Sequence, residues 1–204
     1  MTKRPLANVA ASVHDRLLKR SRESGEDFQF LLQRYTTERF LYRLGESVHR
    51  NEFVLKGAML FALWGGSVYR PTRDLDFTGY GSREAAAVIA AFRSVCAVGV
   101  PADGLVFHPD TLAAEPIRDE TEYQGLRVRL RATIQKARVQ MQIDIGFGNA
   151  IEPPANDVLY PTLLDAPAPN IRAYPHEAVV AEKLHALVVL PRRRCRGRED
   201  YSLL

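Results

Sequence analysis

Residues 126–147, LRVRLRATIQKARVQMQIDIGF, alternate apolar and polar side chains in two successive runs. Such alternation is typical of a strand that buries one face, and the short polar segment at 135–137 predicts a turn between the two runs. The sequence therefore predicts an antiparallel hairpin with one core face. Its other face carries Arg127, Arg129, Arg131 and Thr133 on the first strand and Gln140, Gln142, Asp144 and Gly146 on the second.

Outside this hairpin, apolar residues at helical spacing predict helices over 8–23, 27–48, 83–98 and 174–189, and a helical turn over 58–64. Short strands are expected at 74–78 and 105–108, and a strand or turn at 53–55. The segment 149–172 is rich in Pro and Asn, so we expect it to be irregular. Because strands and helices do not alternate strictly, the pattern favours the α+β class over a doubly wound sheet.

The composition is that of a globular chain: 204 residues, 46% hydrophobic and 25% charged. No window approaches 18 uncharged apolar residues, so we expect no membrane span or signal peptide and a cytoplasmic protein. Neither the two cysteines nor the five histidines have the spacing of a disulfide framework or a zinc site. We expect one compact domain with three parts: N-terminal helices at 1–50, a core at 51–172 and a C-terminal helix with a basic tail at 173–204.

The tetrapeptide Asp74-Leu75-Asp76-Phe77 is the strongest candidate for chemistry. On a strand its two carboxylates project from one face, roughly 6.5–7 Å apart, and a hard cation such as Mg²⁺ would offset their repulsion. Asp144 provides a third carboxylate on the polar face of another strand, so the three acids could share a metal site. In the alternative interpretation, Asp144 forms an ion pair with one of the arginines at 127, 129 and 131.

Two lysines are candidates for binding phosphate. Lys56-Gly57 comes just before a helical turn, where backbone N–H groups can approach a phosphate closely. Lys183 falls on the same helical arc as the apolar positions 179, 180 and 187, so it either reaches water along that surface or meets an anion. Glu182 and His185 are expected to be ordinary surface positions.

The positive charge of the chain is concentrated at its end. The formal net charge is +4, and five arginines lie between 192 and 198. A cluster of guanidinium groups suits a phosphate-bearing partner such as RNA, although a solvated surface would have the same composition.

Four segments occur in an order that resembles one family: LKGAMLFALW at 55–64, RPTRDLDF at 70–77, QIDIGFG at 142–148 and YPHEAVVAEKLHAL at 174–187. The resemblance is to the AbiEii/AbiGii-type nucleotidyltransferase toxins of bacteria, within the DNA polymerase β-like nucleotidyltransferase superfamily, and it extends from about Phe53 to Asp200. It implies an α+β fold with a mixed sheet, N-terminal helices and a C-terminal helical segment.

The resemblance also implies an activity and a set of roles. It implies a Mg²⁺-dependent transfer of a nucleotide from an NTP to an acceptor, RNA such as the tRNA 3′ end, by a toxin with a cognate antitoxin. The implied metal ligands are Asp74, Asp76 and Asp144, which with Lys183 form the implied catalytic set. The implied nucleotide-binding residues are Lys56, Gly57, Thr72, Arg73, Lys183 and Asp200.

This sequence departs from the family pattern at two places. Ala58 stands where the superfamily often has the Ser of a Gly-Ser pair. After the AEKL motif, relatives continue with a segment like RxKDxxDL and further helix, whereas this chain has RGREDYSLL, in which Leu203 takes the place of the second acid. The sequence therefore leaves a second hypothesis, a non-catalytic relative that binds nucleotide, RNA or antitoxin. A DNA-binding regulator is less favoured, because no helix-turn-helix pattern carries the arginines.

Overall fold

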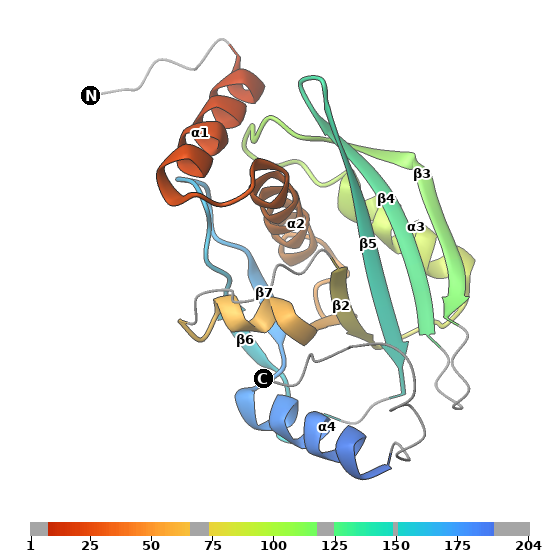
Figure 1. The fold of residues 1–204 in the computed structure, drawn as a ribbon. Coiled ribbons are helices and arrows are strands. Elements are labelled where there is room, and N and C mark those ends of the chain that lie inside the picture. Colours follow the sequence, from red (N-terminus) through yellow and green to blue (C-terminus); the bar gives the residue numbers. More distant parts are fainter. Residues whose placement is uncertain (1–7, 66–73, 118–124, 149–150, 190–204) are drawn as a thin grey trace, which may run out of the picture.

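The computed structural model describes residues 8–65, 74–117, 125–148 and 151–189. A mixed sheet of seven strands, in the order β3-β4-β5-β2-β1-β7-β6, forms its centre (Figure 1). The α+β class expected from the sequence is confirmed. The strands are β1 (Phe53–Lys56), β2 (Asp74–Gly79), β3 (Val106–Ile117), β4 (Gly125–Ile134), β5 (Ala137–Phe147), β6 (Asn156–Leu159) and β7 (Asn170–Ala173).

Strand direction changes within the sheet, and this change positions the candidate site. β4 and β5 form the predicted antiparallel hairpin. β2 is parallel to β5 and antiparallel to β1, and β1 is parallel to β7. The acidic segment of β2 therefore lies between strands from distant parts of the sequence.

The described helices are α1 (Val9–Ser24), α2 (Phe28–Gly45), α3 (Ala85–Cys96) and α4 (His176–Val189), with a 3-10 helix, η1, at Gly57–Ala62. α1 and α2 begin where the side chains of Asn8 and Asp27 accept backbone N–H groups of the first turn. α2 contacts β5 and β7, and α3 packs against β3. α4 lies beyond one end of the sheet, at the bottom of Figure 1.

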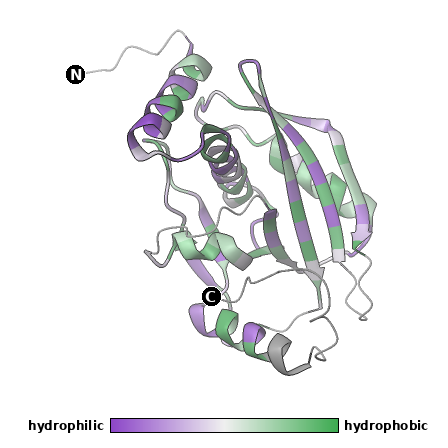
Figure 2. Ribbon diagram, viewed as in Figure 1, coloured by the Kyte–Doolittle hydropathy of each residue, from purple (hydrophilic) through white to green (hydrophobic). Residues whose placement is uncertain are grey.

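Alternating hydropathy gives the sheet a buried and a polar face. Figure 2 shows bands of hydrophobic and hydrophilic residues alternating along β4 and β5. The apolar members of both strands, from Leu126 to Ile134 and from Val139 to Phe147, are buried. Of the helices that the structure describes, none is both long and apolar enough to cross a membrane.

Two secondary-structure predictions were wrong in type or extent. The expected short strand at 105–108 is the much longer β3, which continues beyond Pro109 because its register shifts between His108 and Ala113. The segment 149–172 is not wholly irregular, because it contains β6 and nearly all of β7. The helical segment expected at 58–64 is present as a 3-10 helix at Gly57–Ala62. The division into three segments remains a prediction.

Candidate active site

Charged side chains form a row across the polar face of four neighbouring strands. Lys56 of β1 is opposite Asp76 of β2, and Asp76 is opposite Asp144 of β5. Asp144 is in turn opposite Arg127 of β4. Asp74 lies two residues before Asp76 on the same face of β2, opposite Gln142. The register therefore brings the predicted acids of two distant segments to one region of the sheet, with a cation on each side.

Position 57 requires a glycine, because the backbone there lies against this row of charged side chains. The φ of Gly57 is +74°, a left-handed conformation that glycine adopts without strain. A Cβ atom at this position would overlap the Asp76 carboxylate oxygen Oδ2. The Lys56-Gly57 turn therefore lies directly against Asp76, which explains why a glycine stands at the end of β1.

Asp76 is the most perturbed acid of the row. Its half-buried side chain has a pKa of about 6, raised mainly by loss of solvent and further by the negative charges of Asp144 and Asp74. Lys56 and Lys183 act in the opposite direction. The raised pKa of Asp76 thus reflects burial of its carboxylate first and the neighbouring acids second.

Lys56 extends across the same polar face. Its ammonium Nζ lies 3.6 Å from the place that a Cβ would occupy on Gly146 of β5. Gly146 pairs with Thr78, two positions beyond the Asp76–Asp144 pair. The absence of a side chain at Gly146 therefore leaves room for the lysine beside the acids.

Asp144 is held by Arg127, as the alternative interpretation of the sequence had it. The guanidinium Nε and Nη2 atoms donate to both carboxylate oxygens, at 2.8 and 2.7 Å. The hydrogen bonds to Asp144 raise the pKa of Arg127 above its ordinary value. The Asp144 side chain is 19% exposed. One planar group therefore occupies both oxygens of the third acid.

A hydroxyl network connects α4 to β2. The Tyr174 hydroxyl lies 2.7 Å from the Thr78 hydroxyl, which is fully buried, and donates to Glu182 Oε1 at 3.0 Å. Glu182 is exposed, as the sequence predicts for a surface position, but its hydrogen bond with Tyr174 was not predicted. No hydrophobic spacing marks this contact, because it joins Tyr174, two residues before α4, to the second turn of the helix.

Lys183 follows Glu182 on α4, and its side chain is exposed. The predicted apolar arc is only partly buried, because Val179 packs against the core whereas Val180 is 46% exposed. Lys183 is nevertheless close enough to Asp76 to favour its ionised form. Thr72, Arg73, Asp200, the His185 side chain and the arginines of 192–198 lie outside the described residues.

Comparison with known proteins identifies the family of the chain. A family model described as nucleotidyl transferase AbiEii toxin, type IV TA system, matches residues 39–201. The chain belongs to this AbiEii family. None of the curated proteins compared with the chain matches it.

Two solved structures from Helicobacter pylori also match the AbiEii chain. One is described as a candidate nucleotidyltransferase and the other as JHP933; each has a TM-score of 0.48 and 18% sequence identity over 78% of this chain. The match covers 59% and 57% of those two proteins. This AbiEii chain thus spans less than two thirds of their length.

The donor set of this AbiEii site is suited to a hard cation bound partly by its substrate. Within the described residues, no group of three or more His, Cys, Asp or Glu side chains could hold a metal ion. Mg²⁺ often takes only one or two protein carboxylates together with substrate phosphates, and Asp74 and Asp76 can supply these. Asp144 would first have to separate from Arg127 before it could contribute to such a site.

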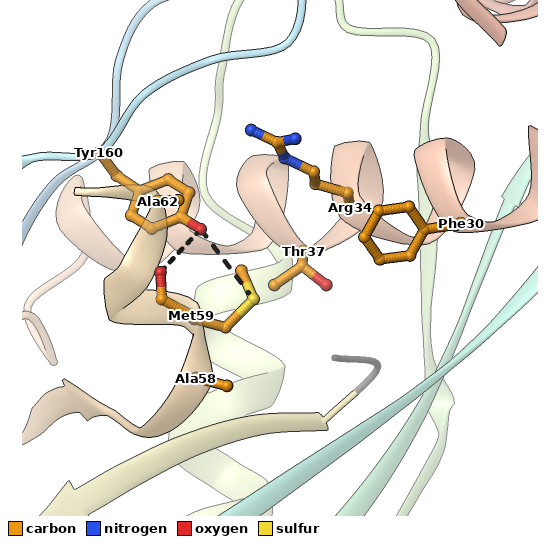
Figure 3. Close-up of a pocket in the computed structure, with 7 residues that line it drawn as sticks. All are labelled: Phe30, Arg34, Thr37, Ala58, Met59, Ala62 and Tyr160. Atoms are coloured by element: carbon orange, nitrogen blue, oxygen red, sulfur yellow. Dashed lines mark hydrogen bonds between the residues drawn. The ribbon is translucent and has the colours of Figure 1, made fainter. Parts of the chain in front are cut away.

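A small pocket lies apart from the charged row, between α2, η1 and Tyr160 (Figure 3). The Tyr160 hydroxyl donates to the Met59 carbonyl at 3.2 Å. None of the predicted site residues in the described part lines this pocket, so we assign it no role in catalysis. Its lining residues are Phe30, Arg34, Thr37, Ala58, Met59, Ala62 and Tyr160.

Proposed function

We propose that this AbiEii chain is a Mg²⁺-dependent nucleotidyltransferase that moves a nucleotide from an NTP to an RNA acceptor such as the tRNA 3′ end. The observation that carries the proposal is the cross-strand row in which Lys56, Asp76 and Asp144 occupy adjacent positions. Carboxylates for a cation and lysines for phosphates are the groups that phosphoryl transfer needs, because positioning and charge neutralisation supply most of its catalysis.

Each residue has a distinct role in this proposal. Asp74 and Asp76 would hold Mg²⁺, which, when bound, offsets charge on the phosphates and the leaving pyrophosphate. The Lys56-Gly57 turn and Lys183 would bind the triphosphate from two sides. An acid of the row or a water molecule would accept the proton of the acceptor hydroxyl.

The family description names a toxin of a toxin–antitoxin system, so we also propose a cognate antitoxin as protein partner. Such a partner would suppress the transfer in the cell. The acceptor, the antitoxin and Mg²⁺ all belong to the proposal.

Substituting one acid and one lysine tests the proposed activity. We expect Asp74→Ala and Lys183→Ala each to reduce transfer of labelled nucleotide from an NTP to total tRNA by about a hundredfold or more. Asp15→Ala and Lys19→Ala change exposed residues of α1 and serve as charge-matched controls. Full activity of both site variants would remove these residues from the mechanism.

The second hypothesis, a non-catalytic nucleotide- or RNA-binding relative, is favoured by one observation. Arg127 occupies both oxygens of Asp144, the third acid of the predicted set. Wild-type protein that binds Mg²⁺ and an NTP, yet transfers nothing to any RNA offered, would support this hypothesis over the enzyme.

A further inference from the structure

The polar face of the β4–β5 hairpin continues beyond the charged row as a basic surface. Arg129 and Arg131 of β4 and Arg138 of β5 share this face, and we call these three residues the basic face. They alternate with buried apolar residues such as Leu130 and Val139, so the strand pattern directs all three arginines to one side. Two glutamines of β5 lie among the arginines: Gln140 is opposite Arg131, and Gln142 is opposite Arg129.

The positive charge of the basic face is only partly offset. Arg129 contacts Glu115 of β3 at 2.7 Å, yet its side chain remains 45% exposed. Arg131 and Arg138 are exposed and have no ion-pair partner among the described residues. Two or three guanidinium groups are therefore available to an anionic partner.

The helices leave this face open within the described structure. α3 packs against β3 and lies behind the β3-β4-β5 part of the sheet in Figure 1. The exposure of Arg129, Arg131, Arg138 and Gln140 shows that no described element covers their side of the hairpin.

The basic face is continuous with the acids of the candidate site. Asp144 and Arg138 lie on the same side of β5, six residues and so about 20 Å apart. A strand of nucleic acid whose terminal hydroxyl meets the charged row would place its preceding phosphates over the arginines. The polar sides of β4 and β5 contain no Phe, Tyr or Trp, so contacts there would be made to the backbone rather than by base stacking.

We propose that the basic face binds the backbone of a single-stranded RNA acceptor end and directs that end toward Asp76 and Asp144. This proposal rests on the proposed function for its choice of RNA. The guanidinium fork of arginine matches phosphate oxygens, and the glutamine side chains between the arginines can donate to the same backbone. The location of the surface follows from strand register and exposure alone.

The test measures RNA affinity against salt concentration for the triple variant Arg129→Gln, Arg131→Gln, Arg138→Gln. The probe is a fluorescein-labelled oligouridylate of about twelve nucleotides, read by anisotropy across a range of KCl concentrations. Each lost phosphate contact reduces the salt slope by about 0.7, so we expect the slope to fall by about 2. NTP binding should not change.

The matched control is Arg16→Gln, Arg22→Gln, Arg93→Gln, which removes the same charge from exposed positions of α1 and α3. We expect it to leave the slope nearly unchanged. Photocrosslinking with 4-thiouridine RNA should label peptides of β4 and β5 in the wild type. Thermal unfolding verifies that both triple variants fold.

Equal slopes for the two triple variants, or crosslinks only outside the hairpin, would overturn the proposal. Absence of RNA binding by the wild type would also overturn it, and would leave an acidic protein partner as the occupant of this face. If RNA binds through the basic face but no nucleotide is ever transferred, the surface stands and the proposed enzymatic function fails. The two proposals can therefore fail separately.

Discussion

Gly57 has a left-handed backbone conformation and also lies against the Asp76 carboxylate. Gly57→Ala would place a methyl group against Asp76 Oδ2 in a backbone region that L-residues avoid. We expect the variant to lose about 1–3 kcal/mol of unfolding free energy and nearly all nucleotide transfer. Denaturant unfolding and the transfer assay measure the two effects.

Gly25→Ala is a matched control, because Gly25 has a φ of +76° but open space at the Cβ position. It isolates the backbone cost from the contact with Asp76. If both variants lost the same stability and kept the same activity, Gly57 would matter only as a turn residue.

Arg127 determines whether Asp144 has oxygens available for a cation. If Mg²⁺ binds at the proposed site, Arg127→Ala frees both oxygens, and we expect Mn²⁺, used as a paramagnetic probe, to bind about tenfold more tightly without nucleotide. Electron paramagnetic resonance titration measures this affinity. Arg129→Ala removes a neighbouring arginine and should change it less. An equal gain in both variants would indicate a general charge effect.

The sequence predicted which face of a strand each candidate residue occupies, but not which side chain it contacts. Alternation placed Asp76 and Asp144 on polar faces correctly, because a two-residue period needs only local sequence. The pairing of Asp144 with Arg127 remained one of two interpretations, because it depends on hairpin register and on which partner is closer. The hydrogen bond of Glu182 was missed, because its donor is a tyrosine outside the helix.

At the scale of elements, the Tyr174 hydroxyl is the described link between α4 and β2. Tyr174→Phe leaves the buried Thr78 hydroxyl without its partner, so we expect a loss of about 1–2 kcal/mol in stability and faster hydrogen exchange in α4. Tyr80→Phe, which removes an exposed hydroxyl, is the control. Unchanged exchange in α4 would mean that other contacts hold the helix.

A buried ion pair joins α2 to the segment that follows β6. Glu38 accepts the Leu163 N–H at 2.7 Å and pairs with Arg39, whose guanidinium donates to the Pro167 carbonyl. Burial raises the pKa of Glu38 to about 7 from an ordinary 4.5. The native state therefore holds a proton that the unfolded chain has released in this interval.

The contribution of Glu38 to the free energy of unfolding is fully present below about pH 4.5 and is lost as pH rises through 7. In Glu38→Gln this loss is absent, so we expect the variant to gain about 2–3 kcal/mol relative to wild type between pH 4.5 and 8. Urea unfolding at several pH values measures it. Glu23→Gln, at an exposed position of α1, should show no such trend. If the difference in unfolding free energy between the wild type and Glu38→Gln did not change with pH, the pH dependence could not be assigned to Glu38.

The elements that the sequence missed are short strands stabilised by distant partners. β7 has four residues, Asn-Ile-Arg-Ala, with no alternation long enough to stand out from the surrounding Pro and Asn. Its place beside β1 and β6 comes from pairing across the sheet. The long β4 and β5 were predicted correctly, because their periodicity extends over eight or more residues.

For the whole molecule, Phe92 connects three parts of the core. Its ring lies 5.5 Å from that of Phe40 on α2 and 4.9 Å from that of Phe53 on β1, between ring centroids. We expect Phe92→Ala to cost about 3–5 kcal/mol, a large share of the stability of a domain of this size. Val106→Ala, at a 57% exposed position, should stay within about 0.5 kcal/mol. Similar unfolding midpoints for the two would contradict this role.

The strand order could not be predicted from local patterns, although it creates the candidate site. The α+β class followed from the succession of elements, whereas the parallel pairing of β2 with β5 brings Asp76 to Asp144 across a long stretch of chain. That pairing is decided by the packing of the complete sheet. The resemblance to AbiEii proteins, and not the periodicity, implied a mixed sheet and grouped Asp76 with Asp144.

The parallel pairing of β1 with β7 has a consequence for synthesis of the protein on the ribosome. β1 is translated early, but β7, its neighbour on the side away from β2, is among the last described strands to be made. A nascent chain therefore exposes one edge of β1, next to the Lys56-Gly57 turn, until β7 has been translated. Pairings between such distant strands form slowly, because a long loop must close first. The described sheet would thus be completed only after β7 is made, which gives a partner made at the same time an interval in which to meet the open edge of β1.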